Sequence, residues 1–117
     1  MREKRILKIL LDNPENEEIF EVNDENIAKV RVFVPDGDKP KELLGEQCHV
    51  ILEMSKDAMV GFATELLRMA YNDEEDSFKE LTPSYSTFVS QYMGIILKSD
   101  SCRLSISKQD LGKVKDI

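Results

Sequence analysis

The sequence has no tryptophan, a single histidine, two cysteines and few aromatic residues, and none of its apolar runs is long. A helix needs about 20 consecutive apolar residues to span a bilayer, and no stretch of this chain approaches that length. The apolar stretch at residues 6–11 is interrupted by Lys8, and it is shorter than the roughly 7–15 residues of a signal-peptide core. We therefore expect no membrane-spanning helix, no cleaved signal peptide and a cytoplasmic location.

The scarcity of histidine and cysteine leaves little material for a metal site or a nucleophile. Cys48 and His49 are adjacent and Cys102 lies far along the chain, a spacing that matches no zinc motif. On a strand, Cys48 and His49 point to opposite faces; His49 and Cys102 could meet across strands, but no third group is evident to orient the base. The acidic stretches lack the glycine of a calcium loop, and no phosphate-binding or nucleophile-elbow motif occurs. We predict no cofactor, no metal, no enzymatic activity and two reduced, buried cysteines.

Acidic residues outnumber basic ones by 23 to 16, which gives a net charge of −7. A field of this sign disfavours nucleic acid and anionic membranes as partners and attracts basic proteins. Seven acids and no base lie between Asp12 and Glu25, and a second acidic group occupies residues 73–76. Such runs are either a solvated surface or a landing site for a cationic protein, and the sequence leaves both interpretations open.

The strongest periodic pattern predicts a helix over about residues 56–71. Ser55 or Asp57 is suited to cap its start, and Asn72 is suited to end it. Apolar side chains recur at helical spacing along the side that we expect to be buried: Met59, Phe62, Ala63, Leu66, Leu67 and Ala70. Gly61 falls on the polar side, where glycine costs about 1 kcal/mol relative to alanine. It either permits a close backbone approach or is a tolerated defect.

Alternation and composition predict strands on both sides of this helix. The expected strands are residues 4–11, 17–22, 27–35, 47–54, 89–100 and 102–108, with 17–34 forming a hairpin and 35–46 and 73–87 forming connections. One amphipathic helix and several half-polar strands predict an α+β fold. We expect an antiparallel or mixed sheet of about five to six strands with the helix packed on one face, in a single domain of residues 1–117.

The second half of the chain combines the helix GFATELLRMAYN with the strand pair SQYMGIILKSDSCRLSIS, which contains a GI-x-L element and an SDS turn. These residues, within roughly 57–107, resemble small immunity proteins of bacterial contact-dependent and other polymorphic toxin systems. The shared features are packing and turn elements, with no catalytic or metal motif. The resemblance implies a protein that binds and blocks a cognate toxin inside the producing cell. Many such toxins are basic nucleases, which suits an acidic partner.

We therefore expect a non-enzymatic domain that neutralises a basic toxin domain by stoichiometric occlusion. The candidate contacts combine steering acids with aromatic anchors: Glu15, Glu17, Glu18, Tyr71, Asp73, Glu74, Glu75, Asp76, Phe78 and Tyr85. The alternative is a small acidic secretion-type chaperone or adaptor that acts as a dimer and binds an extended segment of its partner. An enzyme or small-molecule-binding domain ranks third, because each familiar catalytic constellation fails on spacing or residue inventory.

Overall fold

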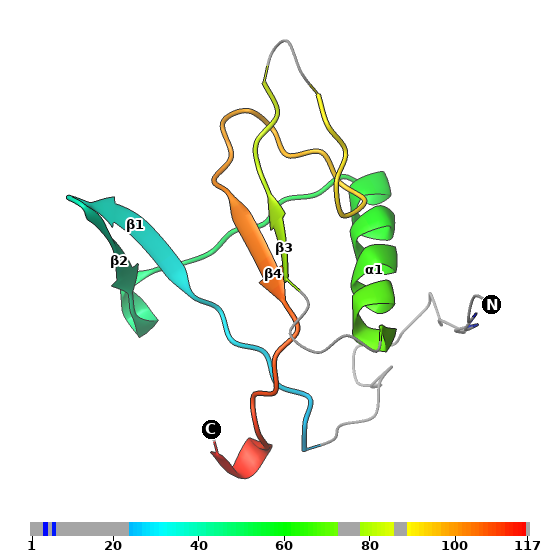
Figure 1. Cartoon of the computed structure of the whole chain (residues 1–117), viewed down its shortest axis with the longest axis horizontal. Helices are drawn as coiled ribbons and strands as arrows, with labels where there is room; N and C mark the ends of the chain where they lie inside the picture. Colours follow the sequence, from blue (N-terminus) through cyan, green and yellow to red (C-terminus); the bar gives the residue numbers. More distant parts are fainter. Residues whose placement is uncertain (1–3, 5, 7–23, 73–77, 86–88, 117) are drawn as a thin grey trace. The chain divides into compact units, whose positions relative to one another are not determined.

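The structure, a computed structural model shown in Figure 1, describes Lys4, Ile6 and residues 24–72, 78–85 and 89–116. The chain divides into two units. The smaller unit joins Met1–Lys29 with Leu111–Ile117, and in it the Val114 amide donates to the Asp24 carbonyl oxygen at 2.8 Å. The larger unit, Val30–Asp110, contains α1 and the four strands found among the described residues. The single domain expected from the sequence stays a prediction.

The larger unit begins with a hairpin of β1 (Val32–Asp36) and β2 (Lys39–Leu43). Asp36 pairs with Lys39, so Gly37 and Asp38 form a two-residue turn. Gly37 has a φ of +63°, and a type II′ turn requires a positive φ at its first central position. The sequence prediction of a loop over 35–46 is therefore wrong. Of the hairpin that the sequence predicted at 17–34, residues 17–23 lie outside the described residues.

Two prolines face each other across this hairpin and account for the wrong prediction. Pro35 pairs with Pro40. In a hairpin with a two-residue turn, the pair beside the turn exchanges hydrogen bonds and the following pair does not. Proline lacks an N–H group, so this following position accepts it without the loss of a ladder bond. A Pro-rich segment can therefore form both strands.

Helix α1 (Lys56–Tyr71) has the limits predicted from the sequence. The Ser55 side chain accepts a hydrogen bond from the Ala58 amide at 3.1 Å, so Ser55 is the N-cap; Asn72 is the C-cap. The Lys108 ammonium donates to the Asn72 carbonyl oxygen at 2.6 Å. A positive charge therefore lies at the helix C-terminus, where the helix dipole favours it.

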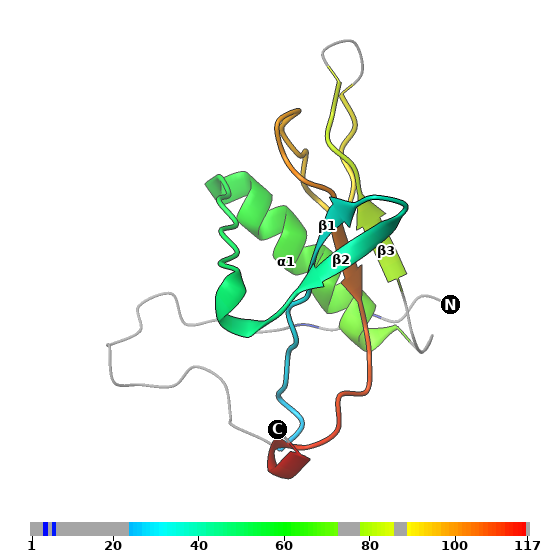
Figure 2. The ribbon, with the colours of Figure 1, turned by 90° about the vertical axis from the view of Figure 1, so that its left-hand side faces the viewer.

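A second antiparallel pair, β3 (Phe78–Leu81) and β4 (Leu104–Ser107), lies beside α1 (Figure 1 and Figure 2). Leu81 pairs with Leu104 and Lys79 with Ile106. The buried core joins this pair to the helix and consists of Phe62, Met69, Leu81, Met93 and Ile95. Leu81 is the most enclosed of them, with 2% of its surface exposed. The strand face that carries Leu81 is thus covered by α1.

A tight turn at Met93 and Gly94 packs onto α1. The φ angles of +52° and +73° at these residues match a type I′ turn. Tyr92 and Ile95 close the turn with two amide–carbonyl hydrogen bonds of 2.9 and 3.0 Å. A Cβ built on Gly61 would overlap the Gly94 carbonyl oxygen and lie 3.0 Å from the carbonyl carbon. Gly61 therefore permits a close backbone approach, which decides between the two interpretations of this glycine.

The buried side of α1 differs from the side that the apolar periodicity predicted. Phe62 and Met69 are buried and Glu65 is half-buried. Most of the predicted buried set is instead exposed: Met59, Ala63, Leu66, Leu67 and Ala70. The contact between Gly61 and Gly94 turns the helix toward its smallest residue. The side with the most apolar residues faces outward as a result.

The sequence predicted the α+β class correctly, but the sheet is divided. Among the described residues the strands form two separate two-stranded sheets, and the predicted single sheet of five to six strands is not seen. β1 and β4 overlap the predicted strands at 27–35 and 102–108, while β3 forms within the predicted connection at 73–87.

Two other predicted strands are wrong. At 47–54 the chain leaves the short 3-10 helix Gly45–Gln47 and continues to Ser55 without pairing to any described strand. The predicted strand at 89–100 contains the turn at Met93 and Gly94. The predictions at 4–11 and 17–22 fall outside the described residues, apart from Lys4 and Ile6.

Candidate functional site

The structure describes the aromatic residues of the predicted contact set, whereas the acidic members lie outside the described residues. These acids are Glu15, Glu17, Glu18, Asp73, Glu74, Glu75 and Asp76. Tyr71, Phe78 and Tyr85 have 45%, 59% and 70% of their surface exposed. Aromatic side chains are enriched at the centres of protein interfaces, so their exposure is compatible with the predicted role as anchors.

Tyr71 and Phe78 bracket the second acidic group in the chain. Tyr71 is the last residue of α1 and Phe78 is the first residue of β3, so residues 73–76 belong to the connection between them. Each end of the anionic segment is therefore close in sequence to an exposed ring. Interfaces commonly combine an apolar anchor that supplies binding energy with charges that guide association.

The side of α1 that is turned away from the core is apolar, and we call it the outer face. It consists of Met59, Val60, Ala63, Leu66, Leu67, Ala70 and Tyr71, all of them exposed. At 3.6 residues per turn, these positions span about 140° of the helix circumference. Contiguous exposed apolar surface marks interaction sites more often than scattered apolar residues do. The outer face ends at Tyr71, shortly before the acidic segment begins.

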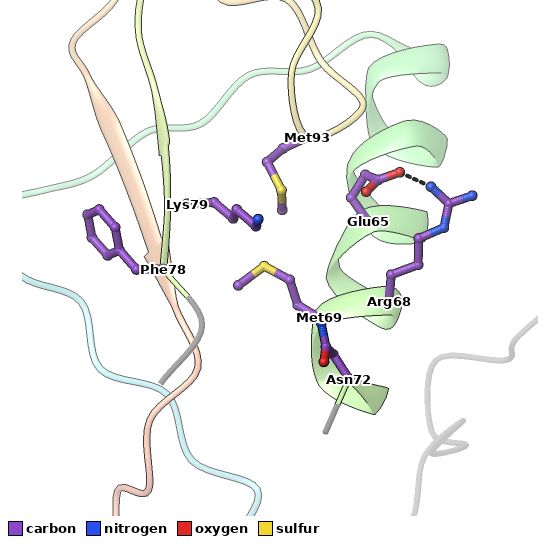
Figure 3. A pocket seen from close by; sticks show the side chains of 7 residues that line it. All are labelled: Glu65, Arg68, Met69, Asn72, Phe78, Lys79 and Met93. Carbon is purple, nitrogen blue, oxygen red and sulfur yellow. Dashed lines mark hydrogen bonds and ion pairs between the residues drawn. The ribbon is translucent and has the colours of Figure 1, made fainter. Parts of the chain in front are cut away.

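A cleft of about 250 Å³ lies between the C-terminal part of α1, the start of β3 and the turn at Met93. Its lining is Glu65, Arg68, Met69, Asn72, Phe78, Lys79 and Met93. Figure 3 shows Met69, Met93 and Lys79 reaching into the space between α1 and β3, while the Phe78 ring lies on the other side of the strand. Small-molecule sites usually measure roughly 300–1,000 Å³. The cleft is slightly smaller than this range.

Sequence reasoning missed this cleft because its residues come from segments that it assigned to other structures. Lys79 was expected in a connection and Met93 in the middle of a strand. Glu65 and Arg68, which form an ion pair three residues apart on α1, were expected on the polar side of the helix. No short motif joins these positions, since they meet only after α1 and β3 have packed together.

The β1–β2 hairpin carries a separate charged cluster. The Arg31 guanidinium donates to the two Glu42 carboxylate oxygens at 2.6 and 3.2 Å, and it lies over the Phe33 ring at 5.0 Å from the centroid. The hydrogen bond to Glu42, and then its negative charge, raise the pKa of Arg31 above its usual value. Arg31 therefore remains charged at any physiological pH and orders one face of the hairpin.

The two cysteines do not form a disulfide and differ in exposure. Cys48 and Cys102 are free thiols; Cys48 is half-buried and Cys102 is exposed, so their predicted burial is wrong. Cys102 directly follows the turn in which the Ser101 amide donates to the Lys98 carbonyl oxygen, where the chain runs over the surface. Within the described part of the chain, no three His, Cys, Asp or Glu side chains are placed to hold a metal ion. That part also contains no helix with the length and apolar character needed to cross a membrane.

Comparisons with protein-family models, with curated proteins and with solved structures found no match in any of the three. The resemblance to immunity proteins therefore stays a prediction.

Proposed function

We propose that this protein is a non-enzymatic, cytoplasmic binding domain that neutralises a cognate bacterial toxin by stoichiometric occlusion. The observation that carries the proposal is the outer face of α1, an exposed apolar surface that ends two residues before the acidic segment 73–76. Apolar residues followed closely in the sequence by acids have the composition of a protein interface, which combines an apolar centre with a polar border. The resemblance of residues 57–107 to immunity proteins supplies the choice of partner.

In this proposal the two parts of the surface have different roles. The outer face and Phe78 lose water when the toxin binds, and this burial provides most of the affinity. The acids at 73–76, together with the overall charge of −7, attract a basic toxin and orient it. Charged residues at the border of an interface mainly change the association rate, whereas the central apolar residues mainly change dissociation.

Identification of the partner is the first test. The tagged full-length chain is purified from its own cell, and proteins that remain bound in stoichiometric amounts are identified. We expect one basic protein, encoded beside this chain, whose toxicity is suppressed when the two are produced together. A stoichiometric partner without toxic activity, or the absence of any stoichiometric partner, contradicts the proposal.

A charge-reversal series then tests the steering role. With the partner in hand, D73K/E74K/E75K should lower the association rate at low salt by about tenfold or more. The matched control D36K/D38K/D100K reverses three exposed acids elsewhere and should change the rate much less. Equal slowing by the two triple variants would show that only net charge matters and would remove the acidic segment from the interface.

A substitution on the outer face tests the anchoring role. Leu67→Lys should speed dissociation at least tenfold, because it places a charge in the apolar centre of the interface. Leu67 is already exposed, so the unfolding midpoint should change little. Gln91→Lys adds the same charge at an exposed position outside α1 and should leave binding unchanged.

A dimeric secretion-type chaperone or adaptor is the second candidate function, and the exposed outer face also favours it. A chaperone would bind an extended, unfolded segment of its partner, whereas a toxin-neutralising protein binds a folded domain. Binding of the partner's isolated peptides, without binding of the folded partner, would therefore select the chaperone. A protein that remains monomeric at high micromolar concentration would count against it.

A further inference from the structure

The segment between Gln47 and α1 leaves apolar side chains and backbone groups without partners among the described residues. Val50, Ile51 and Leu52 have 53%, 70% and 51% of their surface exposed. The backbone enters the segment extended, with φ −137° and ψ 154° at Cys48. In the part of the chain that the structure describes, no backbone hydrogen bond or strand pairing involves these three apolar residues. Figure 1 shows the segment as the green trace between β2 and α1.

An unpaired apolar segment of this kind is a template for another strand. Its backbone groups can exchange hydrogen bonds with any extended chain, so the side chains must decide which chain fits. Strand side chains alternate between two faces, which gives His49, Ile51 and Glu53 one face and Val50 and Leu52 the other. Both faces contain exposed apolar residues, so burial on either face is favourable.

The segment is complementary to itself when two copies run antiparallel around Ile51. In that register Ile51 faces Ile51 of the second copy, Val50 faces Leu52, and His49 faces Glu53. The imidazole N–H of His49 can donate to the Glu53 carboxylate in either protonation state. The half-buried ends, Cys48 and Met54, also face each other, so every pair in the register is apolar–apolar or His–Glu.

Neighbouring registers lose this match. If the centre of the pairing moves to the point between Val50 and Ile51, His49 lies opposite Leu52 and Glu53 lies opposite Cys48. A shift of the centre to Leu52 places Glu53 opposite Ile51. Each shift puts a charged or polar group against an apolar one across the pair, which cross-strand pairing disfavours. The side chains therefore select one register, and that register requires a second copy of the same chain.

We propose that residues 48–54 pair antiparallel with the same residues of a second copy, centred on Ile51, and form a symmetric dimer. A two-fold axis at Ile51 makes every pair except the central Ile51–Ile51 contact occur twice, as in other isologous interfaces. A two-stranded pair is only marginally stable by itself, so the dimer is a weak one that dissociates at roughly micromolar to millimolar concentrations. The dimer does not depend on the toxin-binding role.

Sedimentation equilibrium of the isolated full-length chain, at pH 7 and up to millimolar concentration, tests the dimer. His49→Glu places two carboxylates opposite each other twice in the dimer and should weaken it about tenfold. Glu53→Lys should also weaken the dimer. The double variant H49E/E53K restores opposite charges in the same register and should return most of the affinity. Ser99→Glu adds a negative charge in an exposed turn and serves as the matched control, with no expected change.

Three results would overturn the proposal. A chain that stays monomeric at millimolar concentration excludes the dimer, and slow amide exchange at Val50 and Leu52 in that monomer would assign the pairing to another part of the same chain. A dimer that His49→Glu does not weaken uses another surface, with the outer face of α1 as the first alternative. A double variant as weak as the single variants excludes the register. These measurements use the isolated protein, so a negative result contradicts the dimer without contradicting toxin binding. In the same way, a failure to find a toxin contradicts the proposed function without contradicting the dimer.

Discussion

Replacing Gly61 with alanine tests the central packing contact of the fold, because two physical effects act on this substitution with opposite signs. In an open helix interior, alanine is favoured over glycine by about 1 kcal/mol, so the variant would gain stability. In the structure the added Cβ would overlap the Gly94 carbonyl oxygen and lie 3.0 and 3.1 Å from the carbonyl carbon and Cα. These are backbone atoms that cannot rotate away, so α1 or the turn must move.

The expected cost follows from what that movement disturbs. Overpacking a well-packed interior costs about 1–3 kcal/mol. The turn carries Met93 and Ile95, which are buried against α1, so a shift of the turn also loosens two core side chains. We therefore expect a cost toward the upper end of this range. After subtraction of the helix-propensity gain, we expect Gly61→Ala to lower the free energy of unfolding by about 1–2 kcal/mol.

Urea unfolding followed by circular dichroism measures this change. Ala63→Gly on the exposed outer face calibrates the alanine–glycine difference within the same helix and should cost about 1 kcal/mol. Gly94→Ala should cost more than Gly61→Ala, because it adds the same overlap at a φ of +73°. A Gly61→Ala variant as stable as the original chain, or more stable, would refute the close approach and the rotation of α1 that depends on it.

The other elements give predictions that the same unfolding experiment checks. Leu81→Ala should lower the free energy of unfolding by about 2–5 kcal/mol, because it leaves a cavity at the most enclosed core position. Ser55→Ala removes the side-chain cap of α1 and should cost about 1 kcal/mol. Lys108→Met should cost about 0.3–1 kcal/mol at low salt and less at high salt, since it removes a charge from the helix C-terminus. Gly37→Ala should cost about 1 kcal/mol through its left-handed φ alone, because no atom lies within 4 Å of the added Cβ.

The helix was predictable because all its signals are local. The cap at Ser55, the end at Asn72 and the apolar periodicity between them act within a few turns, and the structure places both ends where the sequence does. Which side of the helix becomes buried is decided by a non-local contact, between Gly61 and a turn more than 30 residues later. Hydrophobic periodicity predicted a side of which only Phe62 is buried, because it registers side-chain character and gives no weight to how closely two backbones can approach.

The strands were predicted less well for a similar reason. β4 has the alternation of Leu104 and Ile106, and its position was predicted. β2 contains Pro40 and β3 follows an acidic connection, so local propensity argued against both. Of the candidate site, the exposed aromatic residues could be selected by type, but the cleft beside Lys79 and Met93 could not, because it exists only where α1, β3 and a turn meet.

The proline pair in the first hairpin also has a consequence for self-association. At a non-hydrogen-bonded pair the backbone N–H groups of an antiparallel ladder point outward, toward any strand that adds to either edge. Pro35 and Pro40 remove that donor from both outer edges of the hairpin at the same level. Neither edge can therefore extend without interruption into a sheet shared between molecules, which is how many natural proteins prevent polymerisation. In a chain with an exposed Val50–Ile51–Leu52 segment, this interruption keeps both edges of the first hairpin from competing with that segment for a strand of another molecule.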